Sequence, residues 1–163
     1  HIHKTDRYGN TPFWVSCWNG HLEIVKLLLN DKRVDINQET NTGATPFFVA
    51  CQKRYIEIVK LLLNDKRVDI NKKNNNGETP FWIVCYFGYI TIMEYIFASE
   101  REVDTNPKDE EEPLIDIAKE RGKEFQSRKE DYTRVVELLE SFKRNPNETR
   151  FKLRLQLGFI GNI

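Results

Sequence analysis

Three cysteines are the side chains whose type and spacing could support nucleophilic, redox or metal chemistry. Cys17, Cys51 and Cys85 lie 34 residues apart, so we expect them at equivalent places in successive stacked units. Stacked helices lie about 8–10 Å apart, whereas a disulfide needs Cα atoms within roughly 7 Å. This spacing argues against disulfides and against a shared zinc ion. We therefore interpret the three cysteines as small buried hydrophobic residues, which are typical of a reducing compartment.

The three histidines do not complete a catalytic arrangement. His1 and His3 lie at the N-terminal end, and His21 follows a glycine between two expected helices. We find no Ser-His-Asp or Cys-His arrangement, no phosphate-binding glycine loop and no spacing of metal ligands. The sequence therefore predicts that the chain is not an enzyme, with no catalytic residues, no metal and no cofactors.

Composition gives no sign of a nucleic-acid or membrane partner. The 163 residues are 39% hydrophobic and 31% charged, and 25 Lys and Arg balance 25 Asp and Glu. A neutral chain has no overall field to attract nucleic acid or an anionic membrane. No run approaches the roughly 20 apolar residues that span a membrane, and the start lacks a signal-peptide profile. We expect an intracellular, cytoplasmic chain that is monomeric as a fragment and does not bind nucleic acid.

A repeated pattern reveals the elements that position these side chains. Residues 9–13 (Gly-Asn-Thr-Pro-Phe) recur as residues 43–47 and 77–81 in closely similar form, 34 residues apart each time. Residues 23–37 repeat letter for letter as residues 57–71. Because self-similarity at a fixed period is typical of stacked repeats, we expect an array of equal units.

Each unit has the pattern of two short helices. Thr11 is a capping residue and Pro12 suits the first helical position, so a helix is expected from here to about Asn19, ended by Gly20. A second helix is expected over residues 22–30 and is apolar around most of its circumference. Because one such pair cannot bury this surface alone, neighbouring units must stack.

These motifs resemble ankyrin repeats over about residues 6–144. The resemblance rests on the Gly-x-Thr-Pro tetrad, on Gly-His-Leu-Glu-Ile-Val-Lys-Leu-Leu-Leu at residues 20–29 and on Val-Asp-Ile-Asn at residues 34–37. The period is one residue longer than the usual 33, and we expect the extra residue at 30–33 and in its copy at 64–67. The resemblance implies an all-α solenoid of stacked helix-turn-helix units.

The expected organisation includes a degenerate fourth unit and an extra C-terminal helix. A charged insertion in the fourth unit is interpreted as a solvated loop or helix extension, with a partner-specific finger as the alternative. Ile2 aligns with Ile36 of the next unit, so we expect the natural protein to extend further at its N terminus. The expected segments are a tail of a preceding repeat at 1–5, repeats at 6–39, 40–73 and 74–107, a capping repeat at 108–144 with its insertion at 123–133, and a C-terminal helix or extension at 145–163.

The last segment has two conflicting signals. Apolar and polar residues alternate over 151–157, which favours a strand. Asn145, Pro146 and Glu148 form a helix-start signature, and Gly158 suits a stop. We predict a helix that covers the end of the array or begins another domain.

Aromatic pairs replace the Leu-His that usually follows Thr-Pro in ankyrin repeats. The residues are Phe13-Trp14, Phe47-Phe48 and Phe81-Trp82. We interpret them as apolar packing that replaces the usual hydrogen bonds of the histidine. The alternative is that Trp14, Phe48 and Trp82 line a ligand groove, since aromatic residues also enrich interfaces.

The resemblance also implies where a partner docks: at the turn tips and on the exposed face of each first helix, on the concave side. The first two units, identical along the second helix, differ completely at residues 18–21 and 52–55, close to these places. Trp18, Tyr86 and Phe87 are our predicted hot spots, with the alternative that Phe87 packs between repeats. The candidate partner-binding residues are Arg7, Tyr8, Asn10, Asn41, Thr42, Asn75, Asn76 and Glu78 at the tips, with Ala44 beside them, and Trp18, Asn19, Gln52, Lys53, Tyr86 and Phe87 on the helices.

The predicted function is therefore non-catalytic binding of a protein or an extended peptide on the concave face. The alternative is a structural spacer or assembly segment of a larger protein, with the ends of the array as its interfaces. Exposure of the predicted hot spots favours the first function, and bare apolar ends favour the second.

Overall fold

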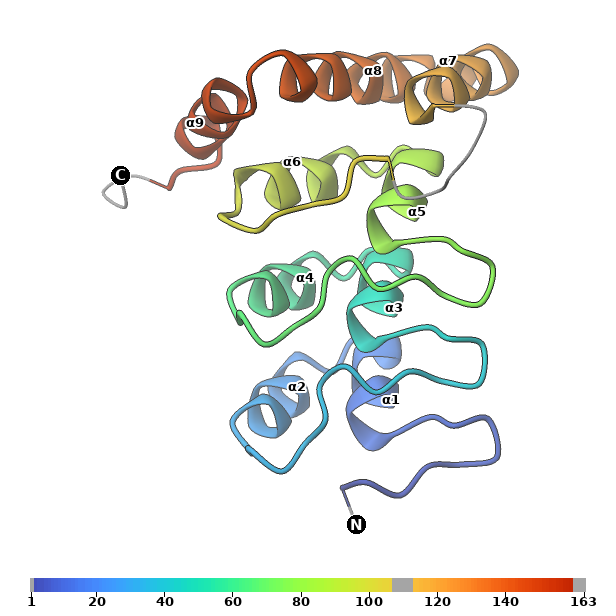
Figure 1. Ribbon diagram of the computed structural model, residues 1–163, viewed down its shortest axis with the longest axis vertical. Coiled ribbons are helices and arrows are strands. Elements are labelled where there is room, and N and C mark those ends of the chain that lie inside the picture. Colours follow the sequence, from blue (N-terminus) through green and yellow to red (C-terminus); the bar gives the residue numbers. More distant parts are fainter. Residues whose placement is uncertain (1, 107–112, 160–163) are drawn as a thin grey trace. The chain divides into compact units, whose positions relative to one another are not determined.

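The computed structural model describes residues 2–106 and 113–159, and all regular secondary structure in these ranges is helical (Figure 1). The expected boundary at residues 107 and 108 and the segment 160–163 lie outside the described residues. The chain divides into two compact units, residues 1–80 and 81–163.

The first unit contains two helix-turn-helix pairs. The pairs are α1 (Pro12–Asn19) with α2 (Leu22–Leu29) and α3 (Pro46–Gln52) with α4 (Ile56–Leu63). Within this unit α1 packs beside α3, and α2 beside α4 (Figure 1). The helices predicted over 12–19 and 22–30 are confirmed to within one residue.

Local capping explains where the first helices begin and end. The Oγ1 of Thr11 accepts a hydrogen bond of 3.1 Å from the backbone N–H of Trp14, and a proline follows at the first helical position. Thr45 caps α3 in the same way, through the N–H of Phe48. Gly20 ends α1 with φ of 74°, a left-handed conformation that glycine adopts without a steric penalty.

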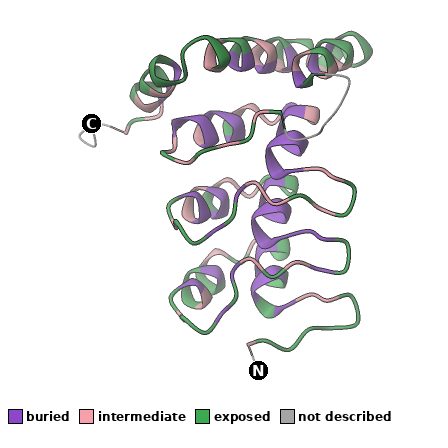
Figure 2. Ribbon diagram, viewed as in Figure 1, coloured by how far each residue is buried: buried purple, intermediate pink, exposed green. Residues whose placement is uncertain are grey.

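The aromatic pairs form part of the core. Figure 2 shows buried residues along α1 and α3, the first helix of each pair in this unit. The prediction that the pairs serve apolar packing is confirmed, because all six side chains are buried: Phe13, Trp14, Phe47, Phe48, Phe81 and Trp82. The alternative, in which three of them line a ligand groove, is wrong because so little of their surface is accessible.

Asparagine side chains connect successive turns of the first unit. The backbone N–H of Asn41 donates to the carbonyl oxygen of Tyr8 at 3.0 Å, and its Nδ2 donates to that of Arg7 at 3.2 Å. One period later, the N–H and Nδ2 of Asn75 donate to the carbonyl oxygens of Thr42 and Asn41. Each exposed turn is thereby held by hydrogen bonds from the next one.

The second unit contains the degenerate repeat and the C-terminal helix. It begins within α5 (Pro80–Tyr86), at the second residue of that helix. The elements that follow are α6 (Ile90–Ala98), α7 (Leu114–Glu124), the short 3-10 helix η1 (Gln126–Arg128), α8 (Lys129–Arg144) and α9 (Pro146–Gln156). Helix α7 packs along α8, and α9 packs against α6 and α8. The residues expected as an insertion, 123–133, extend α7 and α8 and form η1 between them.

The predicted C-terminal helix is confirmed. The Oδ1 of Asn145 accepts a hydrogen bond of 3.1 Å from the N–H of Glu148, and Pro146 occupies the first helical position. Two arginines of α9 then bind the end of α6: Arg150 donates to the carbonyl oxygen of Ser99 at 2.9 Å, and Arg154 to that of Ala98 at 3.1 Å. Cations at these unsatisfied carbonyl groups stabilise the C-terminal end of a helix.

The three cysteines are buried and unpaired, as predicted. Cys17, Cys51 and Cys85 are all free thiols and at most 1% exposed. Burial raises the pKa of the Cys17 thiol to about 12 and raises the pKa of Cys51 and Cys85 as well, because an apolar surrounding disfavours the thiolate. These cysteines act as apolar packing residues.

We expect Gly43→Ala to destabilise the chain more than Gly77→Ala. Both glycines have φ near +80°, which costs an alanine about 1–2 kcal/mol. A Cβ at position 43 would also lie 2.5 Å from the Oδ1 of Asn75 and 2.8 Å from its backbone nitrogen, whereas one at position 77 meets no described atom within 4 Å. Urea unfolding followed by circular dichroism should show an additional loss of about 1 kcal/mol for Gly43→Ala. Equal losses would contradict a stabilising role for the Asn75 hydrogen bonds.

We also expect the three native thiols to resist alkylation. At pH 8 iodoacetamide should modify them at least about a hundredfold more slowly than in urea, because burial limits access and suppresses the reactive thiolate. An Asn19→Cys variant, which places a thiol at an exposed position of α1, supplies the matched control. Mass spectrometry over time measures the modification, and native cysteines that react as fast as the introduced one would disprove the prediction.

Candidate functional site

The predicted tip residues of the first unit differ in how available they are. Asn41 and Asn75 are exposed but already hold neighbouring turns, as described above. Asn10 donates twice to the carboxylate of Asp6, through its backbone and its side chain, both at 3.0 Å. Six predicted tip residues are exposed, namely Arg7, Tyr8, Asn41, Thr42, Asn75 and Asn76, while Asn10 and Glu78 are half-buried and Ala44 is buried. The tip residues therefore also hold the turns together, a structural role that was not predicted from the sequence.

The predicted helix residues of the first unit centre on Trp18. Its side chain is 38% exposed and stacks on Trp14, with ring centroids 5.2 Å apart and an interplanar angle of 16°. The ammonium group of Lys53 lies 3.8 Å from the centroid of the Trp18 ring, a cation–π contact. Asn19 and Gln52 are exposed. The structure therefore holds an accessible indole in place by contacts on α1 and just after α3.

The predicted residues of the second unit are Tyr86 and Phe87, at the end of α5. Both are half-buried, and their rings meet edge to face with centroids 5.1 Å apart. The guanidinium carbon of Arg121 lies 3.8 Å from the centroid of Tyr86 and 4.7 Å from that of Phe125, which is 40% exposed. The two predicted residues thus belong to a cluster with two others from α7 and its C-terminal end.

Residues of the insertion fix the backbone beneath this cluster. Arg128 donates from Nη1 to the carbonyl oxygen of Phe87 at 2.6 Å and from Nη2 to that of Gly88 at 3.1 Å. The hydroxyl of Tyr132 donates to the carbonyl oxygen of Tyr86 at 3.0 Å. These donors satisfy the free carbonyl groups at the end of α5.

Sequence reasoning missed Arg121, Phe125, Arg128 and Tyr132. The available signal was the arginines and aromatic residues gathered in and just before the insertion. Their partners lie about 35 to 45 positions earlier in the chain, and no local pattern identifies contacts at that separation.

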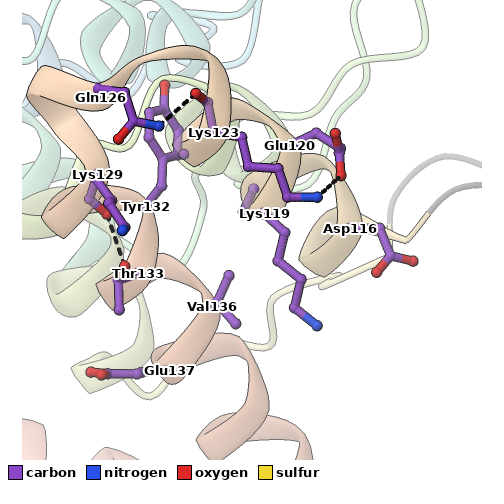
Figure 3. Close-up of a pocket in the computed structure, with 12 residues that line it drawn as sticks. Asp116, Lys119, Glu120, Lys123, Gln126, Lys129, Tyr132, Thr133, Val136 and Glu137 are labelled. Atoms are coloured by element: carbon purple, nitrogen blue, oxygen red, sulfur yellow. Dashed lines mark hydrogen bonds and ion pairs between the residues drawn. The ribbon is translucent and has the colours of Figure 1, made fainter.

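An open groove of about 650 Å³ lies between α7 and α8 (Figure 3). Its lining includes the small residues Ala118 and Gly122 and the apolar side chain of Val136. Charges of both signs surround it, and Lys123 pairs with Glu120 at 2.7 Å.

The described part of the chain contains no group of three or more His, Cys, Asp or Glu side chains that could hold a metal ion. None of its helices is both long enough and apolar enough to cross a membrane.

The comparisons with known proteins agree with this architecture. A family model described as ankyrin repeats (3 copies) matches residues 1–74 and, in an overlapping match, residues 32–109. A search of curated proteins found no match. Ankyrin repeats are generally protein–protein interaction modules and are generally non-catalytic. Because the matches together span residues 1–109 of 163, this chain belongs to the ankyrin-repeat family.

Proposed function

We propose that this chain binds a protein or an extended peptide, without catalysis, through the exposed faces of its first helices and the adjoining turn tips. The observation that carries the proposal is the geometry of Trp18. Its indole is accessible and yet held by Trp14 and Lys53. A preorganised aromatic side chain loses little conformational entropy on binding, so its contacts contribute fully to affinity.

The side chains around Trp18 suggest the chemistry of the partner. Asn19 and Gln52 are exposed amides, which can donate to and accept from the backbone of an extended peptide. The first unit also presents the ring of Tyr8, which the Arg7 guanidinium contacts at 4.7 Å. Mixed aromatic and amide side chains with one neighbouring ammonium group match a protein surface better than a phosphate backbone.

We expect Trp18→Ala to weaken capture of the partner by at least about tenfold. An aromatic anchor at the centre of an interface commonly contributes about 2 kcal/mol or more. The experiment is affinity capture from the source cells followed by a measured dissociation constant for each retained protein, with circular dichroism to verify helicity. Leu27→Ala is the matched control, because Leu27 is a large apolar residue that is 72% exposed on a second helix. Unchanged affinity of Trp18→Ala for every captured protein would refute the proposal.

A second candidate function is assembly through the face of α1 and α2 that points away from α3 and α4. Helices α2 and α4 have identical sequences over residues 23–29 and 57–63. Nevertheless Ile24 is 46% exposed, whereas its counterpart Ile58, in the helix on which α2 packs, is 2% exposed. The first helix pair thus presents apolar residues that the same sequence buries one unit later.

Polar groups on this end face also support the assembly function. Arg67 pairs with Asp65 and also donates from Nη2 to the carbonyl oxygen of Leu29, at the end of α2. Its counterpart Arg33 makes the same local pair with Asp31, and its side chain is 76% exposed. The end face therefore offers an apolar surface and a cation. Equivalent groups, Ile58 and Arg67, contribute to the contact between the two helix pairs of the first unit.

If assembly through this face is the function, we expect Leu27→Ala, and not Trp18→Ala, to abolish capture. Removal of an exposed leucine changes the stability of the isolated chain by no more than about 0.5 kcal/mol, so a loss of capture would report a lost interface. Leu61→Ala, at the same position of α4, serves as the control for the change in side chain. Retention of every captured protein by Leu27→Ala would exclude this function.

A further inference from the structure

We propose that Arg121 is a carboxylate-binding anchor, and that the partner presents an acidic side chain next to an apolar one. The proposal rests on the proposed function, because it gives the chemistry of the contact around Tyr86 and Phe87. It concerns the second unit alone.

The guanidinium group of Arg121 is fixed by three aromatic residues. Its carbon lies 3.8 Å from the ring centroid of Tyr86 and 4.7 Å from that of Phe125. Its Nε donates to the hydroxyl of Tyr132 at 3.2 Å, and this hydroxyl donates to the carbonyl oxygen of Tyr86 at 3.0 Å. Since Tyr132 is buried, this chain of hydrogen bonds rests on a rigid side chain and orients the guanidinium plane.

Two other cations near this position are already paired. Lys123 binds Glu120 at 2.7 Å, and Arg128 binds Asp131 at 3.0 Å. Among the residues that the structure describes, Arg121 forms no ion pair, and neither Nη atom has a hydrogen-bond acceptor. The neighbouring carboxylate on α7, that of Glu124, is exposed and makes no ion pair with it. Within the described part of the chain, this half-buried charge is thus offset by aromatic rings and by the Tyr132 hydroxyl rather than by a carboxylate.

This arrangement matches a carboxylate better than a phosphate group. The two free Nη groups form the fork that binds a carboxylate through two parallel hydrogen bonds. A phosphate monoester carries nearly two charges at pH 7 and is bound by clusters of arginines. The nearest second guanidinium, that of Arg128, is committed to Asp131 and to the carbonyl oxygens of Phe87 and Gly88. The exposed ring of Phe125 favours an apolar neighbour beside the acidic residue.

The test is a titration of the chain, labelled with ¹⁵N in its arginines, with N-acetyl-Leu-Glu-Leu-amide and with its Gln counterpart. We expect the Nε–H resonance of Arg121 to shift and saturate with the Glu peptide, and the Gln peptide to bind at least about fivefold more weakly. In Arg121→Gln this preference should vanish, while Lys119→Gln, which removes an exposed cation from the same helix, should retain it. Because the Glu-to-Gln comparison needs no protein variant, it holds even if Arg121→Gln unfolds.

Several results would overturn the proposal. These are equal binding of the two peptides, no shift of Arg121, an equal loss of preference in Lys119→Gln, or tighter binding of a phosphoserine peptide. The failure of this proposal is distinguishable from that of the proposed function. Capture that depends on Trp18 without a Glu preference defeats only the carboxylate anchor, whereas a Glu preference without Trp18-dependent capture defeats only the binding face around Trp18.

Discussion

The burial of very short helices against their neighbours is the constraint on which the rest of this structure depends. Helices of seven or eight residues, such as α1 and α3, are too short to be stable alone in water. Their stability comes from the burial of apolar side chains, as the complete burial of Val49 and Cys51 illustrates. Aromatic residues increase the buried apolar surface at the positions where ankyrin repeats usually have Leu-His. At these positions apolar packing therefore replaces the usual hydrogen bonds of the histidine.

Short helices also leave a large fraction of backbone groups without helical partners. The structure satisfies many of these groups with a few side chains that reach from one segment to another. Asn41 and Asn75 hold successive turns, Arg67 binds the end of α2, and Arg128 binds the end of α5. These contacts order the exposed turns and helix ends, where a partner is expected to dock, without using the apolar core.

The same division between core and edge explains why the candidate contacts lie where they do. Side chains in the core are used by packing, whereas residues held at its edge keep accessible surface. Trp18 rests on the buried Trp14, and Arg121 rests on Tyr86 and the buried Tyr132. In both places a buried ring supports an accessible group, which lowers the entropic cost of binding.

The sequence by itself determined the 34-residue period, the short helices of the first unit and the start of α9, because capping residues and apolar spacing act within a few residues of the chain. It also identified Trp18 and Tyr86 as candidate contacts. Only the tertiary structure decided that Arg121 and Phe125 lie beside Tyr86, that the insertion binds the end of α5, and that identical residues such as Ile24 and Ile58 differ in exposure. These outcomes depend on contacts between surfaces that are 34 or more residues apart in the chain. The same local sequence is compatible with an exposed or a buried side chain.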